Sequence, residues 1–329
     1  MSRRSRTSRN QKSTDTGGFM RFFILGGTGF VGKHLIDWLV QQGHDVEVLG
    51  RSAKSLERIP SGCRTVIGDP MRPGEWQDRA GRADVVINLV GRSIMTRWNE
   101  VTKKEILESR VQSTRMAVQT LAGDQGKGKV LINANAVGYY PLDRNAVFAE
   151  DGPRGAGFLA EVTQAWQEEA EKARGFGVRV VIARFGTVLG PDGGAMAQLL
   201  PIFRKGLGGR LGSGEQWFPW IHVLDLCRAL EFMSLHAELD GPVNCCAPQA
   251  ATNTYFTRAL GGLLRRPTIF PVPTFAVKLA LGEVAQVVLQ GSKIVPKALT
   301  DAGFTFRFGM LEGALQDILA QKQTQAEAK

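Results

Sequence analysis

Four glycines follow an apolar run near the start of the chain, in the stretch FFILGGTGFVG at residues 22–32. Gly27, Gly29 and Gly32 satisfy G-x-G-x-x-G, and Gly26, Gly29 and Gly32 satisfy G-x-x-G-x-x-G. Such glycines allow a tight turn, the approach of a pyrophosphate to the backbone, and packing of the next helix on the strand. Because a helix N-terminus attracts anions, the stretch predicts a dinucleotide site, with a purely structural turn as the alternative. The predicted contacts are Gly26, Gly27, Thr28, Gly29, Phe30, Val31 and Gly32.

The end of the second predicted strand, residues 44–51, distinguishes between two dinucleotides. A carboxylate there would bind the ribose 2′-hydroxyl of NAD, but the sequence has Gly50 and Arg51. Arginine can hold a 2′-phosphate through charge-assisted hydrogen bonds, so NADP(H) is favoured over NAD(H). A solvated loop arginine is the alternative interpretation.

Two further strand ends carry candidate cofactor contacts. Asp69 ends the third predicted strand and could accept a hydrogen bond from the adenine amino group, or be an ordinary strand-end aspartate. Asn88 opens the stretch NLVG, where a fourth strand would expose its backbone to the cofactor ribose.

Alternating strands and helices must position these residues. The apolar pattern predicts strands at 21–25, 44–51, 65–69 and 84–91, a strand with its exit at 130–140, and a strand with a following loop at 178–190. It predicts helices at about 32–42, 99–122 and 158–177. This order predicts an α/β fold with a Rossmann-type, doubly wound parallel sheet. We expect a dinucleotide-binding domain over residues 20–190, with a return strand around 219–246. Residues 191–329 predict a smaller, mostly helical substrate domain that caps the carboxyl edge of the sheet.

The formal net charge is +10, of which residues 1–19 contribute +4. These 19 residues are polar and predict a disordered basic tail. The alternatives are that these residues form an organelle transit peptide, or that translation starts at Met20. The expected location is the cytoplasm, or an organelle stroma or matrix if the tail is a transit peptide.

Cysteine and hydropathy patterns exclude several classes of protein. Cys63, Cys227, Cys245 and Cys246 have neither metal-ligand nor disulfide spacing, which predicts no metal site and a reducing compartment. No apolar run is long enough to span a membrane. No motif predicts specific binding to nucleic acid.

Together these stretches resemble the extended short-chain dehydrogenase/reductase superfamily. More narrowly, the chain is similar to its atypical NAD(P)-dependent epimerase/dehydratase-like branch, which carries a C-terminal domain of unknown function. The resemblance covers nearly all of residues 21–320. It rests on GGTGFVG, NLVG, AVGYY, RFGTVLGPDGGAM, FRKGLGGRLGSGEQWFPWIHVLDL and FAVKLALGE, among others.

The resemblance implies further cofactor contacts: Gly50, Arg51, Leu89, Val90, Glu105, Arg110 and Arg184. For Glu105 and Arg110, a solvated helix surface is the alternative. For Arg184, which would lie near the nicotinamide half, the alternative is a structural ion pair.

The catalytic pattern of the superfamily is broken in this chain. Active members of the superfamily that this chain resembles carry a Tyr-x-x-x-Lys pair and a nearby hydroxyl group. They need a proton donor or acceptor because hydride transfer at a carbinol is accompanied by proton transfer. Here Phe158 and Val162 stand at the Tyr and Lys positions, and neither can move a proton. Tyr139 and Tyr140 are the candidate surrogate acids, with aromatic packing as the alternative.

Asn135, Arg210 and His222 are the candidate substrate-facing residues. Arg210 and His222 could meet a phosphate or carboxylate, which predicts an anionic small-molecule substrate. A structural histidine at a strand end is the alternative for His222. A homodimer is also expected from the resemblance.

Two functions remain open from the sequence. One is an NADP(H)-dependent oxidoreductase or epimerase/dehydratase with non-standard proton chemistry. The other is a catalytically silent, NADP(H)-dependent regulatory or scaffold protein, in which cofactor binding biases a partner surface.

Overall fold

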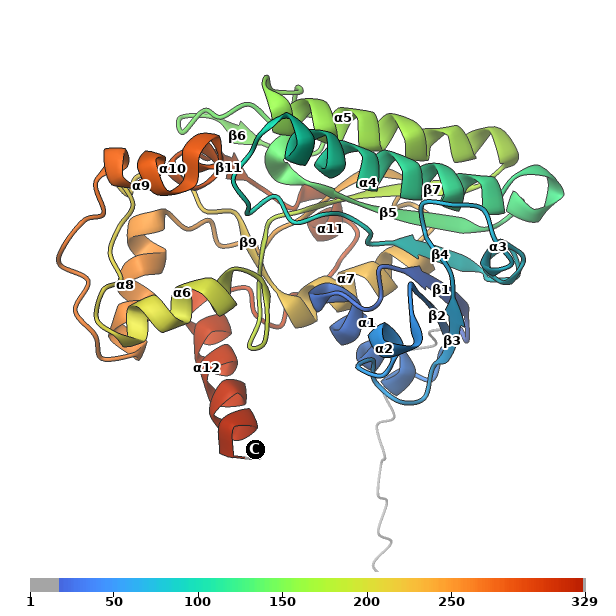
Figure 1. Ribbon diagram of the computed structural model, residues 1–329, viewed down its shortest axis with the longest axis horizontal. Helices are drawn as coiled ribbons and strands as arrows, with labels where there is room; N and C mark the ends of the chain where they lie inside the picture. Colours follow the sequence, from blue (N-terminus) through green and yellow to red (C-terminus); the bar gives the residue numbers. More distant parts are fainter. Residues whose placement is uncertain (1–17, 328–329) are drawn as a thin grey trace, which may run out of the picture.

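The structure is a computed structural model that describes residues 18–327 (Figure 1). All but the last two residues of the predicted basic tail lie outside these residues. The described chain forms a central sheet with helices on both faces and a helical C-terminal part beside it.

Seven parallel strands form the central sheet, in the order β10-β7-β5-β4-β1-β2-β3. The predicted α/β, doubly wound class is therefore confirmed. The strands are β1 (Arg21–Leu25), β2 (Asp45–Gly50), β3 (Arg64–Ile67), β4 (Val85–Asn88), β5 (Val130–Ala136), β7 (Arg179–Phe185) and β10 (Gly241–Cys245).

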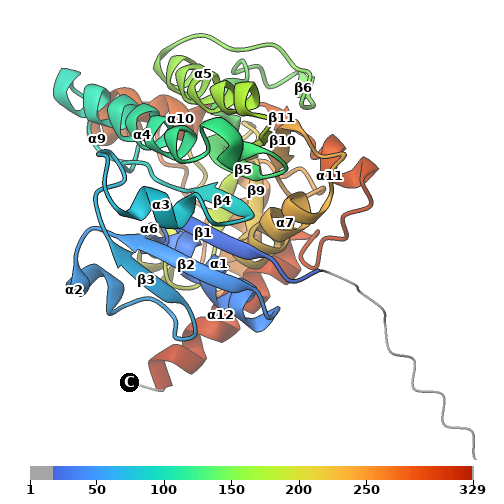
Figure 2. The same cartoon turned by 90° about the vertical axis from the view of Figure 1, so that its right-hand side faces the viewer.

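Helices cover both faces of the sheet, which is why its strands are nearly continuous apolar runs. α1 (Phe30–Gln41) and α7 (Val223–Leu235) lie on one face. α3 (Trp76–Ala80), α4 (Glu100–Thr120) and α5 (Phe158–Glu171) lie on the other, as Figure 2 shows.

Successive residues of β1 alternate between the two faces. Phe22 and Ile24 join the core under α1 and α7, and Phe23 and Leu25 join the core under α3 and α4. Both cores therefore hold β1, and the turn that follows it starts from a rigid position.

The predicted return segment at 219–246 contains two strands with different partners. β9 (Trp220–His222) pairs with β8 (Thr187–Leu189) in a small separate sheet, and only β10 joins the central sheet, beside β7. α7 separates the two strands, and its apolar side packs against α1.

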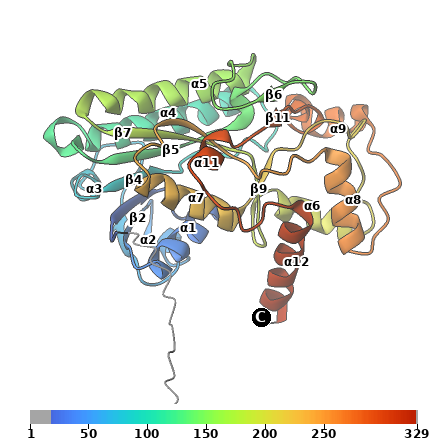
Figure 3. The same cartoon turned by 180° about the vertical axis from the view of Figure 1, so that it is seen from behind.

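The C-terminal part is mostly helical. α6 (Gly194–Arg204), α8 (Asn253–Leu263) and α12 (Leu311–Glu327) share an apolar core of their own, beside the sheet in Figure 3. The other α-helices and strands are α2 (Ala53–Leu56), α9 (Thr274–Leu281), α10 (Ala285–Leu289), α11 (Lys297–Asp301) and the paired strands β6 (Val147–Phe148) and β11 (Lys293–Ile294). Within residues 18–327, no helix has the length and apolar character that a membrane crossing requires.

Candidate dinucleotide-binding site

The glycine turn lies where the strand order reverses. β1 and β4 are neighbours, and the helices that follow them, α1 and α4, cover opposite faces of the sheet. Ligands of doubly wound sheets bind in the crevice at this point, beyond the carboxyl ends of the strands.

Three glycines of this turn have separate mechanical roles. Gly26 has a φ of +79°, and a Cβ there would lie 2.8 Å from the backbone carbon of Leu89. At Gly32 a Cβ would lie 2.5 Å from the Cα of Gly27, so this glycine lets α1 pack on the turn. A Cβ on Gly29 would meet only the Gly26 oxygen, at 3.3 Å, and would otherwise point into open space. Gly26 thus allows the tight turn, Gly29 leaves the space in front of α1 open, and Gly32 allows the helix to pack on the turn.

Gly27 belongs to the core and not to the open face. A Cβ there would lie 2.5 Å from Val48 Cγ1 and 3.1 Å from Ile36 Cδ1. The G-x-x-G-x-x-G spacing therefore describes the open side of this turn better than G-x-G-x-x-G.

The N-terminus of α1 opens toward the same space. The helix begins at Phe30, its N-cap is Gly29, and no described side chain caps it. The first backbone N–H groups of a helix have no partner within the helix and favour an anion. These residues fit the pyrophosphate of a dinucleotide.

Sequence reasoning missed a second glycine cluster that holds this helix. Cβ atoms on Gly190, Gly193 or Gly194 would lie 2.3–2.9 Å from the ring of Phe30, so these glycines let the β8–α6 loop close over it. His34 Nε2 is also 2.8 Å from Asp192 Oδ1 of that loop. The signal was the stretch GPDGG at 190–194. Phe30 therefore positions α1 through its side chain.

Asn88 is fully buried and organises the exit of β4. Its Nδ2 donates to Asn133 Oδ1 at 2.9 Å and to Thr114 Oγ1 at 3.0 Å. Its Oδ1 accepts from the Val90 N–H at 3.1 Å. Asn88 thus fixes the Leu89–Val90 backbone, which lies against Gly26, instead of presenting its own amide to a ligand.

Arg51 is exposed directly after β2, and no described residue forms a hydrogen bond or ion pair with its side chain. A Cβ on Gly50 would lie 2.4 Å from Leu56, so that glycine lets α2 close on the strand end. By contrast, Asp69 Oδ1 accepts from the Met71 N–H at 2.9 Å. This local turn favours the strand-end interpretation of Asp69.

Arg110 lies beside the β4 exit and has no carboxylate partner among the described residues. Its Nη1 donates to the carbonyls of Arg92 and Ile106 at 3.0 and 2.9 Å, and its guanidinium lies 5.0 Å from the Trp166 ring centre. Burial lowers the pKa of Arg110 to about 10. A desolvated, unpaired guanidinium suits an anion. Glu105 instead pairs with Arg92.

The positions of the missing Tyr-x-x-x-Lys pair lie in an apolar cluster, in which Val162 is buried and Phe158 is partly buried. Val162 is 2% exposed and packs with Ile106 and Val284. The Phe158 ring contacts Trp98, with ring centres 5.0 Å apart. No side chain of this cluster can accept or donate a catalytic proton.

The two candidate tyrosines have different environments. Tyr140 is buried, and its hydroxyl donates to Asn244 Oδ1 at 2.7 Å and accepts from Arg184 Nη1 at 2.8 Å. Burial raises the pKa of Tyr140 to about 12. Tyr139 is half-buried, and no described residue forms a hydrogen bond with its hydroxyl. The structure therefore favours a packing role for Tyr140.

Arg184 is 1% exposed and lies over the ring of Tyr139, with the guanidinium carbon 3.7 Å from the ring centre. Its other contacts are neutral: Nη2 donates to Gln167 Oε1 at 3.0 Å, and Nη1 reaches the Glu150 carbonyl at 3.2 Å. No described carboxylate forms an ion pair with Arg184, which argues against the ion-pair alternative. A place near the nicotinamide half of a bound cofactor stays a prediction.

The three predicted substrate-facing residues differ in burial and in hydrogen-bond partners. Asn135 is 2% exposed, and its Nδ2 donates to the Thr163 carbonyl at 3.0 Å. Arg210 is exposed on the loop after α6, where Nη1 donates to the Ser213 carbonyl. Asn135 is thus a structural residue, and only Arg210 is accessible.

His222 is 1% exposed and is the N-cap of α7, where Nδ1 accepts from the Leu224 N–H at 3.1 Å. Its Nε2 lies 3.2 Å from Asp317 Oδ2, but not in hydrogen-bonding geometry. Burial lowers the pKa of His222 to about 3 and raises that of Asp317, so both groups are held toward their neutral forms. This placement supports the structural alternative for His222 and not substrate contact.

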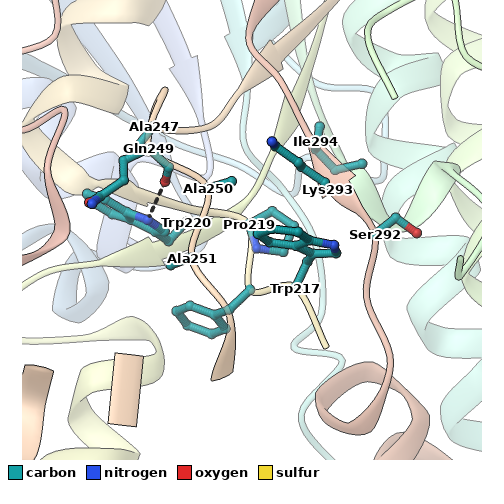
Figure 4. A pocket seen from close by; sticks show the side chains of 11 residues that line it. Trp217, Pro219, Trp220, Ala247, Gln249, Ala250, Ala251, Ser292, Lys293 and Ile294 are labelled. Atoms are coloured by element: carbon teal, nitrogen blue, oxygen red, sulfur yellow. Dashed lines mark hydrogen bonds between the residues drawn. The ribbon is translucent and has the colours of Figure 1, made fainter. Parts of the chain in front are cut away.

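Two cavities lie in or beside the C-terminal part. One, of about 10 Å³, lies between Trp217, Trp220 and Ile294 and is too small for a substrate (Figure 4). The other, of about 700 Å³, is lined by residues 211–213 and by α9 and α10, including Lys278 and Gln286. Among residues 18–327 no group of histidine, cysteine and carboxylate side chains could hold a metal, and the four cysteines are free.

The parallel sheet, the open glycine turn and the uncapped helix define a dinucleotide-binding protein of the doubly wound class. The chain belongs to the NAD dependent epimerase/dehydratase family, which matches residues 22–246. Residues 272–318 match a domain of unknown function, DUF1731. The predicted resemblance is therefore confirmed.

Relatives from distant organisms match along almost the whole chain. The chloroplastic homologue of epimerase family protein SDR39U1 from Arabidopsis thaliana is 38% identical over 305 residues, 91% of this chain and 87% of that protein. Epimerase family protein YfhF from Bacillus subtilis is 35% identical over 306 residues, 93% and 100% of the two chains. The crystal structure of human epimerase family protein SDR39U1 with NADPH has a TM-score of 0.80 at 32% identity and covers 91% of this chain and 99% of that one.

Proposed function

We propose that this chain is an NADP(H)-binding member of its family. The observation that carries the proposal is the uncapped N-terminus of α1, with the open face of Gly29 in front of it. Arg51 and Arg110 add two guanidinium groups without carboxylate partners. The NADPH bound to the human relative supports the same choice of cofactor.

Arg51 would select the phosphorylated cofactor. It follows β2, where the fold brings the adenosine ribose of a dinucleotide, and no carboxylate stands there to receive a 2′-hydroxyl. Gly50 lets α2 approach the end of β2, and the Arg51 side chain beside it is exposed.

Calorimetric titration with NADPH and with NADH tests this selection. Arg51→Ala should weaken NADPH binding by about 1–3 kcal/mol, the size of a charge-assisted contact, and leave NADH binding nearly unchanged. Arg82→Ala removes another exposed arginine and is the matched control. An equal loss for both dinucleotides, or none for NADPH, would contradict the proposal.

For a reaction, we propose Tyr139 as the proton donor. Bound NADPH supplies a hydride, and reduction of a carbonyl then needs a proton at the oxygen. Tyr139 has a hydroxyl without a described partner, and Arg184 holds its ring. Tyr140 is unsuited because its hydroxyl is bonded on both sides.

The test is oxidation of NADPH with a panel of aldehydes and ketones that carry a carboxylate or a phosphate, the anionic class that Arg210 would bind. Turnover by the wild type should disappear in Tyr139→Phe, while NADPH affinity stays the same. Turnover that survives this substitution would reject Tyr139 as the donor.

The apolar cluster around Phe158 and Val162 favours the second candidate, a regulatory or scaffold protein without turnover. Tight NADPH binding without oxidation of any compound in the panel would support it. The homodimer and a location in the cytoplasm or an organelle stay predictions, and the chloroplastic relative is consistent with an organelle.

A further inference from the structure

Five large apolar side chains of the C-terminal part are highly exposed, on the loop after α6, the loop before α9 and α9 itself. Leu207 is 70% exposed, Ile269 78%, Phe270 83%, Phe275 73% and Leu279 76%. We name these five residues the apolar tip. Single exposed apolar residues are ordinary, but a contiguous group marks an interaction surface.

Backbone contacts bring the segments of the tip together. The Val272 N–H donates to the Arg210 carbonyl at 2.8 Å, and the Gly212 N–H donates to the Val272 carbonyl at 2.9 Å. The loop after α6 therefore runs beside the loop before α9, at the left-hand edge of the molecule in Figure 1. Phe275 and Leu279 follow on α9, four residues apart and so on one side of that helix.

All charged side chains in the segments that carry the apolar tip are basic. Residues 193–214 and 241–282 contain no aspartate or glutamate. Five exposed basic side chains flank the apolar residues, and no described residue pairs with them: Arg204, Lys205, Arg265, Arg266 and Lys278. The surface therefore combines apolar side chains with uncompensated positive charge.

We propose that the apolar tip docks this protein on the surface of an anionic membrane. Exposed phenylalanine, leucine and isoleucine side chains enter the boundary of the acyl chains, and basic side chains around them meet lipid phosphates. The proposed contact is peripheral, at the lipid surface.

Charge argues against a second copy of the chain as the occupant. Two facing tips would bring like charges together without any carboxylate from these segments to compensate them. Nucleic acid would satisfy the cations, but it would leave five apolar side chains without a suitable contact. An anionic lipid surface offers contacts to both the apolar and the basic side chains. This proposal does not depend on the proposed reaction.

Vesicle sedimentation tests the proposal with the full chain. Large vesicles of phosphatidylcholine with about 30% phosphatidylglycerol are compared with vesicles of phosphatidylcholine alone, at about 0.1 M salt. The wild type should partition at least about 10-fold more strongly to the anionic vesicles.

Substitutions separate the apolar and the charged contributions. Phe270→Ser with Phe275→Ser should lower the partition coefficient about 10-fold, and Arg265→Ser with Arg266→Ser should lower it and weaken its salt dependence. Met310→Ser, at a residue that is 60% exposed outside the tip, is the apolar control and should leave binding unchanged. Unchanged thermal midpoints would show that the variants fold.

Three outcomes would overturn the proposal. One is no binding to anionic vesicles. Another is equal binding by the wild type and the tip variants, which would assign the membrane contact elsewhere, for example to the basic first 19 residues. The third is wild-type self-association, or binding to soluble polyglutamate, that the tip variants lose while vesicle binding persists; the occupant would then be a second copy or an acidic protein.

Discussion

Gly29→Ala should separate cofactor binding from folding. Gly29 has an ordinary extended backbone, with φ −78° and ψ 178°, so alanine can adopt it without strain. The added methyl group would meet one protein atom, at 3.3 Å. We therefore expect the free energy of unfolding to change by no more than about 1 kcal/mol, because the lost N-cap preference and the gained backbone rigidity oppose each other and are of similar size.

The same methyl group would occupy the space in front of α1, where the pyrophosphate is proposed to lie. Hydrogen bonds to charged groups contribute about 1.5–3 kcal/mol each. Loss of one such bond should lower NADPH affinity about 10-fold to 100-fold, because each 1.4 kcal/mol corresponds to about a factor of ten.

Gly32→Ala is the matched contrast. Its methyl group would lie 2.5 Å from the Cα of Gly27 and 2.6 Å from the Gly26 oxygen, so backbone must move. Overpacking of this kind lowers the free energy of unfolding by about 1–3 kcal/mol, and the higher helix propensity of alanine raises it by about 1 kcal/mol. Calorimetry and urea denaturation of both variants provide the test. NADPH affinity of Gly29→Ala within about twofold of the wild type would refute the proposed position of the pyrophosphate.

Three further predictions concern the buried polar groups and the apolar cluster. Tyr140→Phe should lower the free energy of unfolding by about 1–3 kcal/mol, because Asn244 and Arg184 each lose a buried partner; a urea titration showing no loss would contradict this. His222→Asn keeps a cap acceptor for α7 but should flatten the acid dependence of stability. The pKa of His222 is about 3 in the folded protein and has its ordinary value of 6.5 in the unfolded chain. Between pH 3 and pH 6.5 the unfolded chain therefore binds a proton at His222 that the folded protein does not bind. As the pH falls through this window, the free energy of unfolding of the wild type should therefore decrease by up to about 1.4 kcal/mol per pH unit more than that of the variant. Urea denaturation at a series of pH values measures both slopes, and equal slopes would contradict the prediction. Val162→Lys should lower the thermal midpoint sharply and should not raise turnover above that of the wild type, because the site of Val162 is apolar and closed; a stable variant would show that the site admits water.

Local patterns were sufficient for the sheet and the glycine turn. The strands are rich in apolar residues and helices lie between them along the chain, so the alternation predicted the parallel topology. The glycine turn was recognisable because it combines a strand end, glycine spacing and a helix start within 11 residues. The lack of a carboxylate after β2, on which the choice of NADP(H) rests, was also visible as sequence.

The tertiary structure decided what each candidate side chain can do. Tyr139 and Tyr140 are equivalent as sequence, but Asn244 and Arg184 reach only the hydroxyl of Tyr140. Whether a polar group is free or bonded depends on burial and on partners from distant elements, as for Asn244, 104 residues along the chain.

His222 was undecided for the same reason: its strand-end position was visible, but its contact with α12 was not. The apolar tip likewise came from two segments that are about 60 residues apart and become neighbours through the Arg210–Val272 backbone contact. The sequence by itself therefore determined the fold class and the place of the dinucleotide turn, because these depend on local periodicity and backbone freedom. Only the tertiary structure decided which polar and apolar side chains remain available for chemistry or contact, because solvent access and pairing are set by residues far apart in the chain.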